Sequence, residues 1–92
     1  MEDKFSDLAN TLTDLINILR EFEKTKDDYK KPDIRAYLVK MLSLAEIIGN
    51  TALIHTQKLL DDVDDYLSNP QKEKFSALIN DAIKLQNDLW EI

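Results

Sequence analysis

Hydrophobic residues recur at alternating spacings of three and four along two stretches, one towards each end of the chain. The first stretch aligns Phe5, Leu8, Leu12, Leu15, Leu19 and Phe22. The second aligns Phe75, Leu78, Ala82, Leu85, Leu89 and Ile92. This spacing brings apolar side chains to one face of an α-helix, with polar residues on the other faces. We therefore predict two amphipathic helices that each bury one face.

The two stretches also resemble each other at polar positions. Residues 4–22 and 74–92 are identical at nine of nineteen aligned positions, including Lys-Phe-Ser at both starts. The leucines follow from the heptad spacing alone. The remaining matches have two interpretations, chance combined with shared helix chemistry or a true repeat. A true repeat would place both helices in similar environments beside the middle of the chain.

The middle of the chain is more apolar than either end. Within residues 37–48 only three positions are polar, namely Lys40, Ser43 and Glu46. A helix this apolar is covered by neighbours on most sides. Pro32 fits its first turn, because the missing N–H would have no partner there. The charged run 24–31 before it has no apolar periodicity and is predicted to be a loop.

A break is expected at Gly49-Asn50. The heptad line before it is Ile34, Leu38, Met41, Ala45 and Ile48, and the line after it is Leu53, Leu60, Val63 and Leu67. These lines differ by one residue, about 100° of rotation, which gradual supercoiling cannot absorb. Glycine suits a left-handed helix cap, and Thr51 is a candidate cap for the next helix. A continuous, kinked middle helix is the alternative.

A second boundary lies at residues 68–71, where Ser68 and Gln71 have the spacing of a capping box. The chain is therefore expected to form a single all-α domain over residues 1–92. The favoured architecture is an antiparallel up-and-down bundle of four helices, with three helices as the alternative. One glycine and two prolines in 92 residues leave few of the tight turns that a β-sandwich requires.

Charge and composition exclude several function classes. The net charge of -6 has the wrong sign for a protein that neutralises phosphates, so no nucleic acid partner is expected. Lys40 and Glu46 lie inside the most apolar stretch, 36–54, which argues against membrane insertion. The chain has no cysteine, and its first ten residues, MEDKFSDLAN, lack the apolar core of a signal peptide. We expect a cytoplasmic protein.

Catalytic chemistry is not expected. The acidic pairs are accompanied by no second histidine, no cysteine and no glycine-rich phosphate loop. The Glu-x-x-His pairs of diiron bundles are absent, as are the glycine and terminal glutamate of a calcium-binding loop. The sequence therefore predicts no enzyme, no metal site and no cofactor.

His55 is the only histidine and Lys58 follows it on the same helix face. A small acidic helical bundle with one histidine resembles a histidine-phosphotransfer domain, in which an exposed imidazole accepts a phosphoryl group and a nearby lysine steadies it. Such domains carry a small residue after the lysine, whereas Leu59 and Leu60 stand here. His55 with Lys58 is thus the alternative functional site.

The favoured function is a non-enzymatic protein-binding module, such as an adaptor, inhibitor or immunity-type protein. It acts through helix faces and is expected to self-associate, because residues 37–54 offer more apolar surface than a small bundle readily hides. The candidate partner-binding residues are Tyr37, Met41, Leu44, Ile47 and Trp90, with the acidic run Asp61, Asp62, Asp64 and Asp65. Bacteriocin-immunity proteins are similar in size and shape, without a shared motif.

Overall fold

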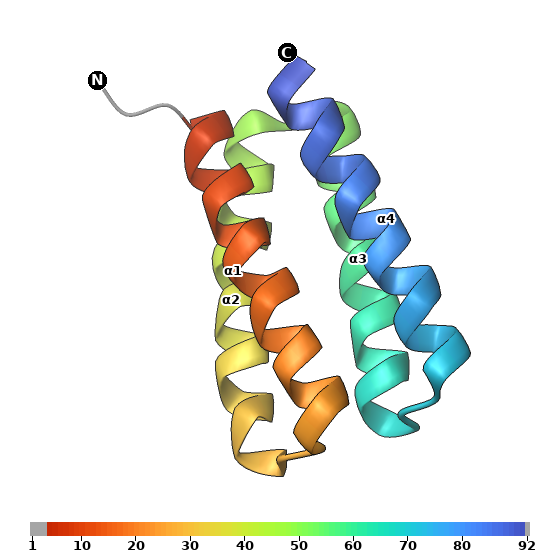
Figure 1. Cartoon of the computed structure of the whole chain (residues 1–92). Helices are drawn as coiled ribbons and strands as arrows, with labels where there is room; N and C mark the ends of the chain where they lie inside the picture. Colours follow the sequence, from red (N-terminus) through yellow and green to blue (C-terminus); the bar gives the residue numbers. More distant parts are fainter. Residues whose placement is uncertain (1–3, 92) are drawn as a thin grey trace.

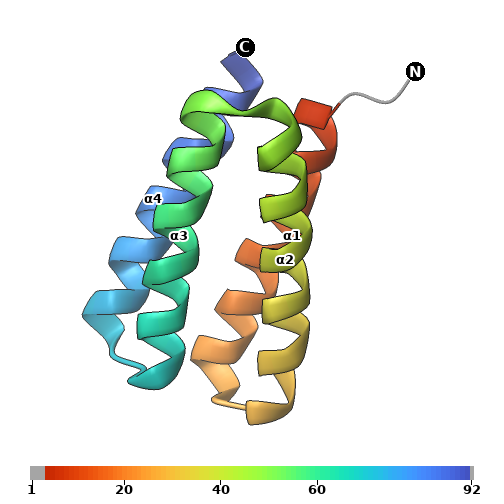
Figure 2. The ribbon, with the colours of Figure 1, turned by 180° about the vertical axis from the view of Figure 1, so that it is seen from behind.

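The computed structural model describes residues 4–91, with only the backbone described at positions 50, 88, 90 and 91. The elements are α1 (Lys4–Thr25), the short 3-10 helix η1 (Asp28–Lys30), α2 (Lys31–Ile48), α3 (Asn50–Ser68) and α4 (Lys72–Glu91). Each long helix runs antiparallel to the one before it, with α1 and α4 on one side of the bundle and α2 and α3 on the other (Figures 1 and 2). The four-helix prediction is confirmed, and the continuous middle helix is wrong.

The bundle closes into a ring, because α1 packs against α2 and α4, and α3 packs against α2 and α4. One apolar core lies between them. It includes Leu8, Leu12, Leu15, Leu19 and Phe22 of α1, Ile34, Leu38, Met41 and Ala45 of α2, Leu59, Val63, Tyr66 and Leu67 of α3, and Leu78, Ala82, Leu85 and Leu89 of α4. The described residues of both predicted heptad lines therefore face the core, and Ile92 lies outside the described residues. Of the two similar helices, α1 packs against α2 and α4 packs against α3.

Gly49 makes the turn between α2 and α3. Its N–H donates a 2.7 Å hydrogen bond to the carbonyl oxygen of Ala45, which caps α2. Its φ of 79° and ψ of -171° lie in a region that essentially only glycine adopts. Apart from its two chain neighbours, no described residue has an atom within 4 Å of the position of a Cβ, so the backbone conformation, rather than lack of space, calls for glycine. Gly49 is also the N-cap residue of α3, and the predicted cap Thr51 lies inside the helix.

The residues of α3 that face the core agree only in part with the predicted line, of which Val63 and Leu67 are buried as predicted. Thr56, Leu59 and Val63 are almost completely buried, whereas Leu53 and Leu60 are only partly buried. The prediction was incomplete because it followed apolar residues and passed over the small polar Thr56, which is buried on the core face.

Ser68 does not cap α4. It is the last residue of α3, and its hydroxyl donates a 2.9 Å hydrogen bond to the carbonyl oxygen of Asp64, one turn back. The predicted capping box is therefore wrong, since Ser68 is still helical. The first loop is also shorter than predicted, because α1 continues to Thr25 and η1 occupies residues 28–30.

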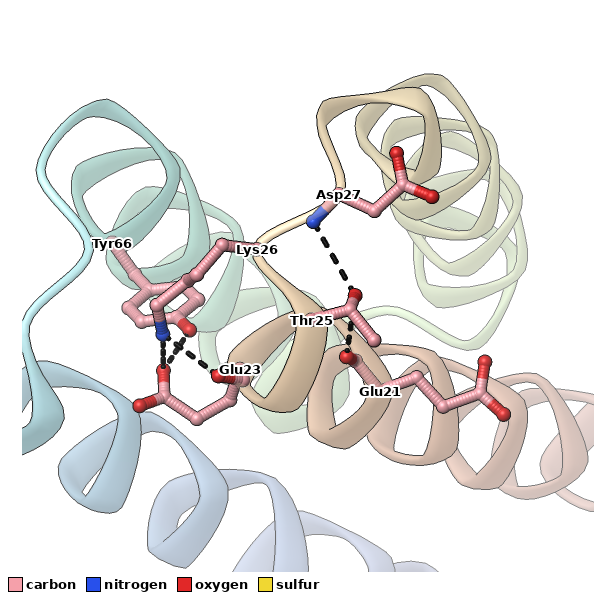
Figure 3. Close-up of polar contacts among 6 residues, drawn as sticks. All are labelled: Glu21, Glu23, Thr25, Lys26, Asp27 and Tyr66. Atoms are coloured by element: carbon pink, nitrogen blue, oxygen red, sulfur yellow. Dashed lines mark hydrogen bonds and ion pairs between the residues drawn. The ribbon is translucent and has the colours of Figure 1, made fainter.

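An aromatic cluster fills the end of the bundle where α1 and α3 terminate and α4 begins. Tyr66 packs edge-on against Phe22, with ring centroids 5.8 Å apart, and lies 5.7 Å from the ring of Phe75. The Tyr66 hydroxyl donates a hydrogen bond to Glu23, and Lys26 Nζ lies 2.6 Å from the same carboxylate (Figure 3). Three helices are thereby joined at one end.

Within the part of the chain that the structure describes, no helix has the length and apolar character needed to cross a lipid bilayer.

Candidate interaction surface

Met41 and Leu44 do not fit a surface role in this fold. Their side chains are 0% and 9% exposed, because the face of α2 that carries them packs into the chain's own core. Tyr37 is half-buried, and Ile47 is 64% exposed. Trp90 belongs to α4, but its side chain lies outside the described residues. The core therefore takes up part of the apolar middle segment. Val39, Ile47 and Ile54, all within residues 37–54, remain 64–65% exposed, so part of the predicted apolar surface is uncovered.

A surface groove lies between α2 and α3, the two helices nearest the viewer in Figure 2. Its hollow has a volume of about 480 Å³ and is lined by Arg35, Leu38 and Val39 of α2 and by Leu60, Asp64 and Ser68 of α3. Leu38 and Leu60 supply a buried or partly buried apolar floor. Val39 stands at the edge with 65% of its side chain exposed, although it is a large aliphatic residue.

The groove carries one charge of each sign. Arg35 lies one turn into α2, and Asp64 lies one turn before the end of α3. Because the two helices are antiparallel, both residues line the same end of the groove. Among the described residues, no ion pair engages either of them. Both charges are therefore exposed and available to a partner.

The acidic run on α3 is divided between different surfaces. Asp64 lines the groove with α2, whereas Asp62 and Asp65 border a separate hollow with α4. There Asp65 pairs with Lys74 at 3.1 Å. Burial raises the pKa of Asp62, and the neighbouring carboxyl of Asp81, to which it is hydrogen-bonded, raises it further. The run therefore does not form a single acidic patch.

Metal-binding groups do not converge in the described part of the chain. Among these residues, no three histidine, cysteine, aspartate or glutamate side chains lie close enough together to hold an ion.

His55 is exposed on the α3–α4 side of the bundle. It borders a hollow of about 260 Å³ together with Lys58 of α3 and with Asp81 and Lys84 of α4. The structure thus brings a second lysine beside the predicted pair. Leu59 lines the base of the same hollow but is 2% exposed, so its side chain is packed into the core and does not project from the surface.

Sequence analysis missed Arg35, Val39, Leu60 and Lys84. A signal for Val39 was present. Side chains two positions apart in a helix point in directions about 160° apart, and the core residue Met41 is two positions from Val39. Val39 must therefore point outwards once Met41 points inwards. No such signal existed for Lys84, whose position beside His55 depends on how α4 packs against α3.

Comparison with known proteins adds no relative. No protein-family description matches the chain, and neither curated proteins nor solved structures give a significant match.

Proposed function

We propose that this chain is a non-enzymatic, cytoplasmic protein-binding module that acts through the α2–α3 groove. The observation that carries the proposal is the groove itself, with an apolar floor, a 65% exposed valine at its edge and two charges without ion-pair partners among the described residues. Protein interfaces commonly combine an apolar centre with polar groups at the rim. The groove therefore has the composition of a contact surface, and it revises the residues expected from sequence.

Site-specific photo-cross-linking in the native host tests this proposal. A photoreactive phenylalanine analogue replaces Val39 in one variant and Ile54 in another. Ile54 is a matched control, because it is also 65% exposed but does not line the groove. We expect a discrete adduct with a protein, either a different one or a second copy, from position 39 and none from position 54. Equal labelling from both positions, or no adduct from position 39, would contradict the proposal.

A second candidate function is phosphotransfer through His55. The favouring observation is that Lys58 and Lys84, from two different helices, border the same hollow as the exposed imidazole. In this reaction a ring nitrogen of neutral His55 attacks the phosphorus of a donor aspartyl phosphate. The new N–P bond forms as the P–O bond to the aspartate breaks, and the carboxylate leaves. The two ammonium groups then balance the charge of the phosphoryl group.

Incubation with a phosphorylated response regulator separates the two candidates. Phosphotransfer predicts that the intact mass of the chain rises by one phosphoryl group, that the product is acid-labile, and that His55→Ala abolishes it. Lys84→Ala is expected to slow the transfer, because it removes one of the two neighbouring cations. An unchanged mass after prolonged incubation with several regulators would exclude this second function and leave the first one untouched.

A further inference from the structure

We infer that the α2–α3 groove receives the same groove of a second copy of this chain, in a two-fold symmetric dimer. The symmetry axis runs parallel to the helices, so α2 of each subunit lies against α3 of the other. This inference rests on the proposed function and names its partner.

The register of the α2–α3 hairpin makes the face self-complementary. Arg35 and Asp64 lie four residues from the outer ends of α2 and α3, and Val39 and Leu60 lie eight residues from those ends. Rotation about an axis parallel to the helices keeps each residue at its level and exchanges the two helices. Arg35 therefore meets Asp64 of the partner subunit, and Val39 meets Leu60 of the partner subunit.

Charge decides between a second copy and other occupants. The groove presents a cation on its α2 side and an anion on its α3 side, at the same level. The two-fold operation forms two Arg35–Asp64 contacts with no like charges opposed. A uniformly basic helix would meet the cation, and a uniformly acidic helix would meet the anion. Electrostatic complementarity thus favours the chain's own surface over either of these partners.

The size of the face is sufficient for a weak dimer. α2 has 18 residues and α3 has 19, which gives a length of about 27 Å, and two adjacent helices are about 20 Å wide. This footprint is near the lower end of specific interfaces, at about 600 Å² per partner. An interface of this kind is expected to dissociate in the micromolar range, where dilution separates the subunits.

The test is sedimentation equilibrium of the full chain across a dilution series, with charge-exchanged variants. Arg35→Asp places two pairs of like charges in the interface, and Asp64→Arg does the same with the opposite sign. We expect each variant alone to raise the dimer dissociation constant by on the order of 10-fold or more. The double variant, and an equimolar mixture of the two single variants, restore dimerisation because each contact again joins opposite charges.

Matched controls separate this effect from a change in net charge or folding. Arg20→Asp and Asp14→Arg alter exposed residues of α1, outside the groove, and are expected to leave the dissociation constant unchanged. Thermal unfolding followed by circular dichroism verifies that every variant is folded. Val39→Lys is expected to weaken the dimer, whereas Asn17→Lys, at an exposed position of α1, is not.

Two results would overturn the dimer. One is a wild-type chain that stays monomeric up to millimolar concentration, and the other is a dimer that the two single reversals leave intact. Neither result refutes the proposed function, because cross-linking from position 39 to a different protein would still support it. The absence of any adduct from position 39 would instead refute the proposed function itself.

Discussion

The hydroxyl of Tyr66 on α3 donates a hydrogen bond across the end of the bundle to the carboxylate of Glu23 on α1. Lys26, three residues after Glu23, forms an ion pair with the same carboxylate (Figure 3). The Lys26 ammonium and the Tyr66 hydroxyl therefore both stabilise the charged Glu23 side chain. Tyr66 is fully buried, and this burial raises the pKa of its phenol. The hydrogen bond to Glu23 raises that pKa further. This contact links two helices that are not neighbours in the ring.

Replacing Tyr66 with phenylalanine keeps the edge-on packing against Phe22 but removes the hydrogen bond to Glu23. Hydrogen bonds to charged groups contribute more than neutral ones, and we expect the free energy of unfolding to fall by about 1–2 kcal/mol. Urea denaturation measures this change. Tyr29→Phe is the control, because Tyr29 is 90% exposed and is expected to have almost no effect. Equal effects of the two variants would contradict the role assigned to the contact.

The same contact predicts a dependence of stability on pH. The hydrogen bond from Lys26 lowers the pKa of Glu23 below its ordinary value of 4.5, and the bond from Tyr66 lowers it further. The folded chain therefore binds this proton less readily than the unfolded chain. The stabilisation is fully present above about pH 4.5 and is lost as the pH falls through the folded-state pKa. We expect Glu23→Gln to reduce this loss of stability at low pH, measured by urea denaturation at a series of pH values. An unchanged loss of stability would contradict the role of Glu23.

The pKa of Asp62 shifts in the opposite direction to that of Glu23, so its effect on stability has the opposite pH dependence. Burial and then the carboxyl of Asp81 raise its pKa above 3.8, so the folded chain binds this proton more readily than the unfolded chain. The associated stability is greatest below pH 3.8 and is lost as the pH rises through the folded-state pKa. Asp62→Asn is expected to raise the free energy of unfolding at pH 7 by roughly a few tenths of a kcal/mol. A higher melting temperature measures this gain. The exposed Asp61→Asn is the control, and a larger gain there would refute the interpretation.

Thr56 lies on the core face of α3 with 0% exposure, and its buried hydroxyl has no hydrogen-bond partner among the described residues. Thr56→Val preserves the branched shape and removes the unsatisfied group, so we expect a gain in stability of about 1 kcal/mol. Thr11→Val is the matched comparison, because the buried Thr11 hydroxyl donates a 2.8 Å bond to the Asp7 carbonyl oxygen. That variant is expected to gain less or to lose stability. Loss of stability in Thr56→Val would indicate that the hydroxyl is satisfied.

Gly49 offers a test that separates backbone conformation from space. L-alanine at this position is expected to destabilise the chain by about 1–3 kcal/mol, because the φ of 79° is strained for an L-residue. D-alanine favours this region, because the φ of 79° and ψ of -171° mirror an ordinary extended conformation of L-residues. A chemically synthesised chain with D-alanine at position 49 is expected to be about as stable as the wild type or up to about 1 kcal/mol more stable. Thermal unfolding of both chains measures the difference, and equal destabilisation by both alanines would contradict the conformational explanation.

The strictness of a pattern determined how far each element could be predicted. α1 and α4 have unbroken heptad lines, and every described residue in those lines is buried or partly buried. Gly49 located the central turn, because the change of helix phase there cannot be absorbed by one continuous helix. The core face of α3 was harder to predict, since its leucines occur on several sides and its true core face includes Thr56.

The candidate surface was less predictable because it depends on which apolar residues the bundle leaves uncovered. Met41 and Val39 are both apolar, yet one is fully buried and the other is 65% exposed. The meeting of Arg35 and Asp64 at one groove depends on the packing of two helices, and their separation of 29 positions gives no local pattern. His55 and Lys58, in contrast, are on one helix and were identifiable from their spacing.

The ring of helix contacts has a consequence for how the chain folds. Three of its four helix interfaces join helices that are consecutive in sequence, and only the packing of α1 against α4 requires the two halves to come together. Such a low contact order is typical of domains that fold within microseconds to milliseconds. We expect the α1–α2 and α3–α4 hairpins to form first and the α1–α4 interface last. A substitution at the α1–α4 interface, such as Gln86→Ala, which removes the hydrogen bond that the Gln86 side chain donates to Thr13, would then accelerate unfolding more than it slows folding.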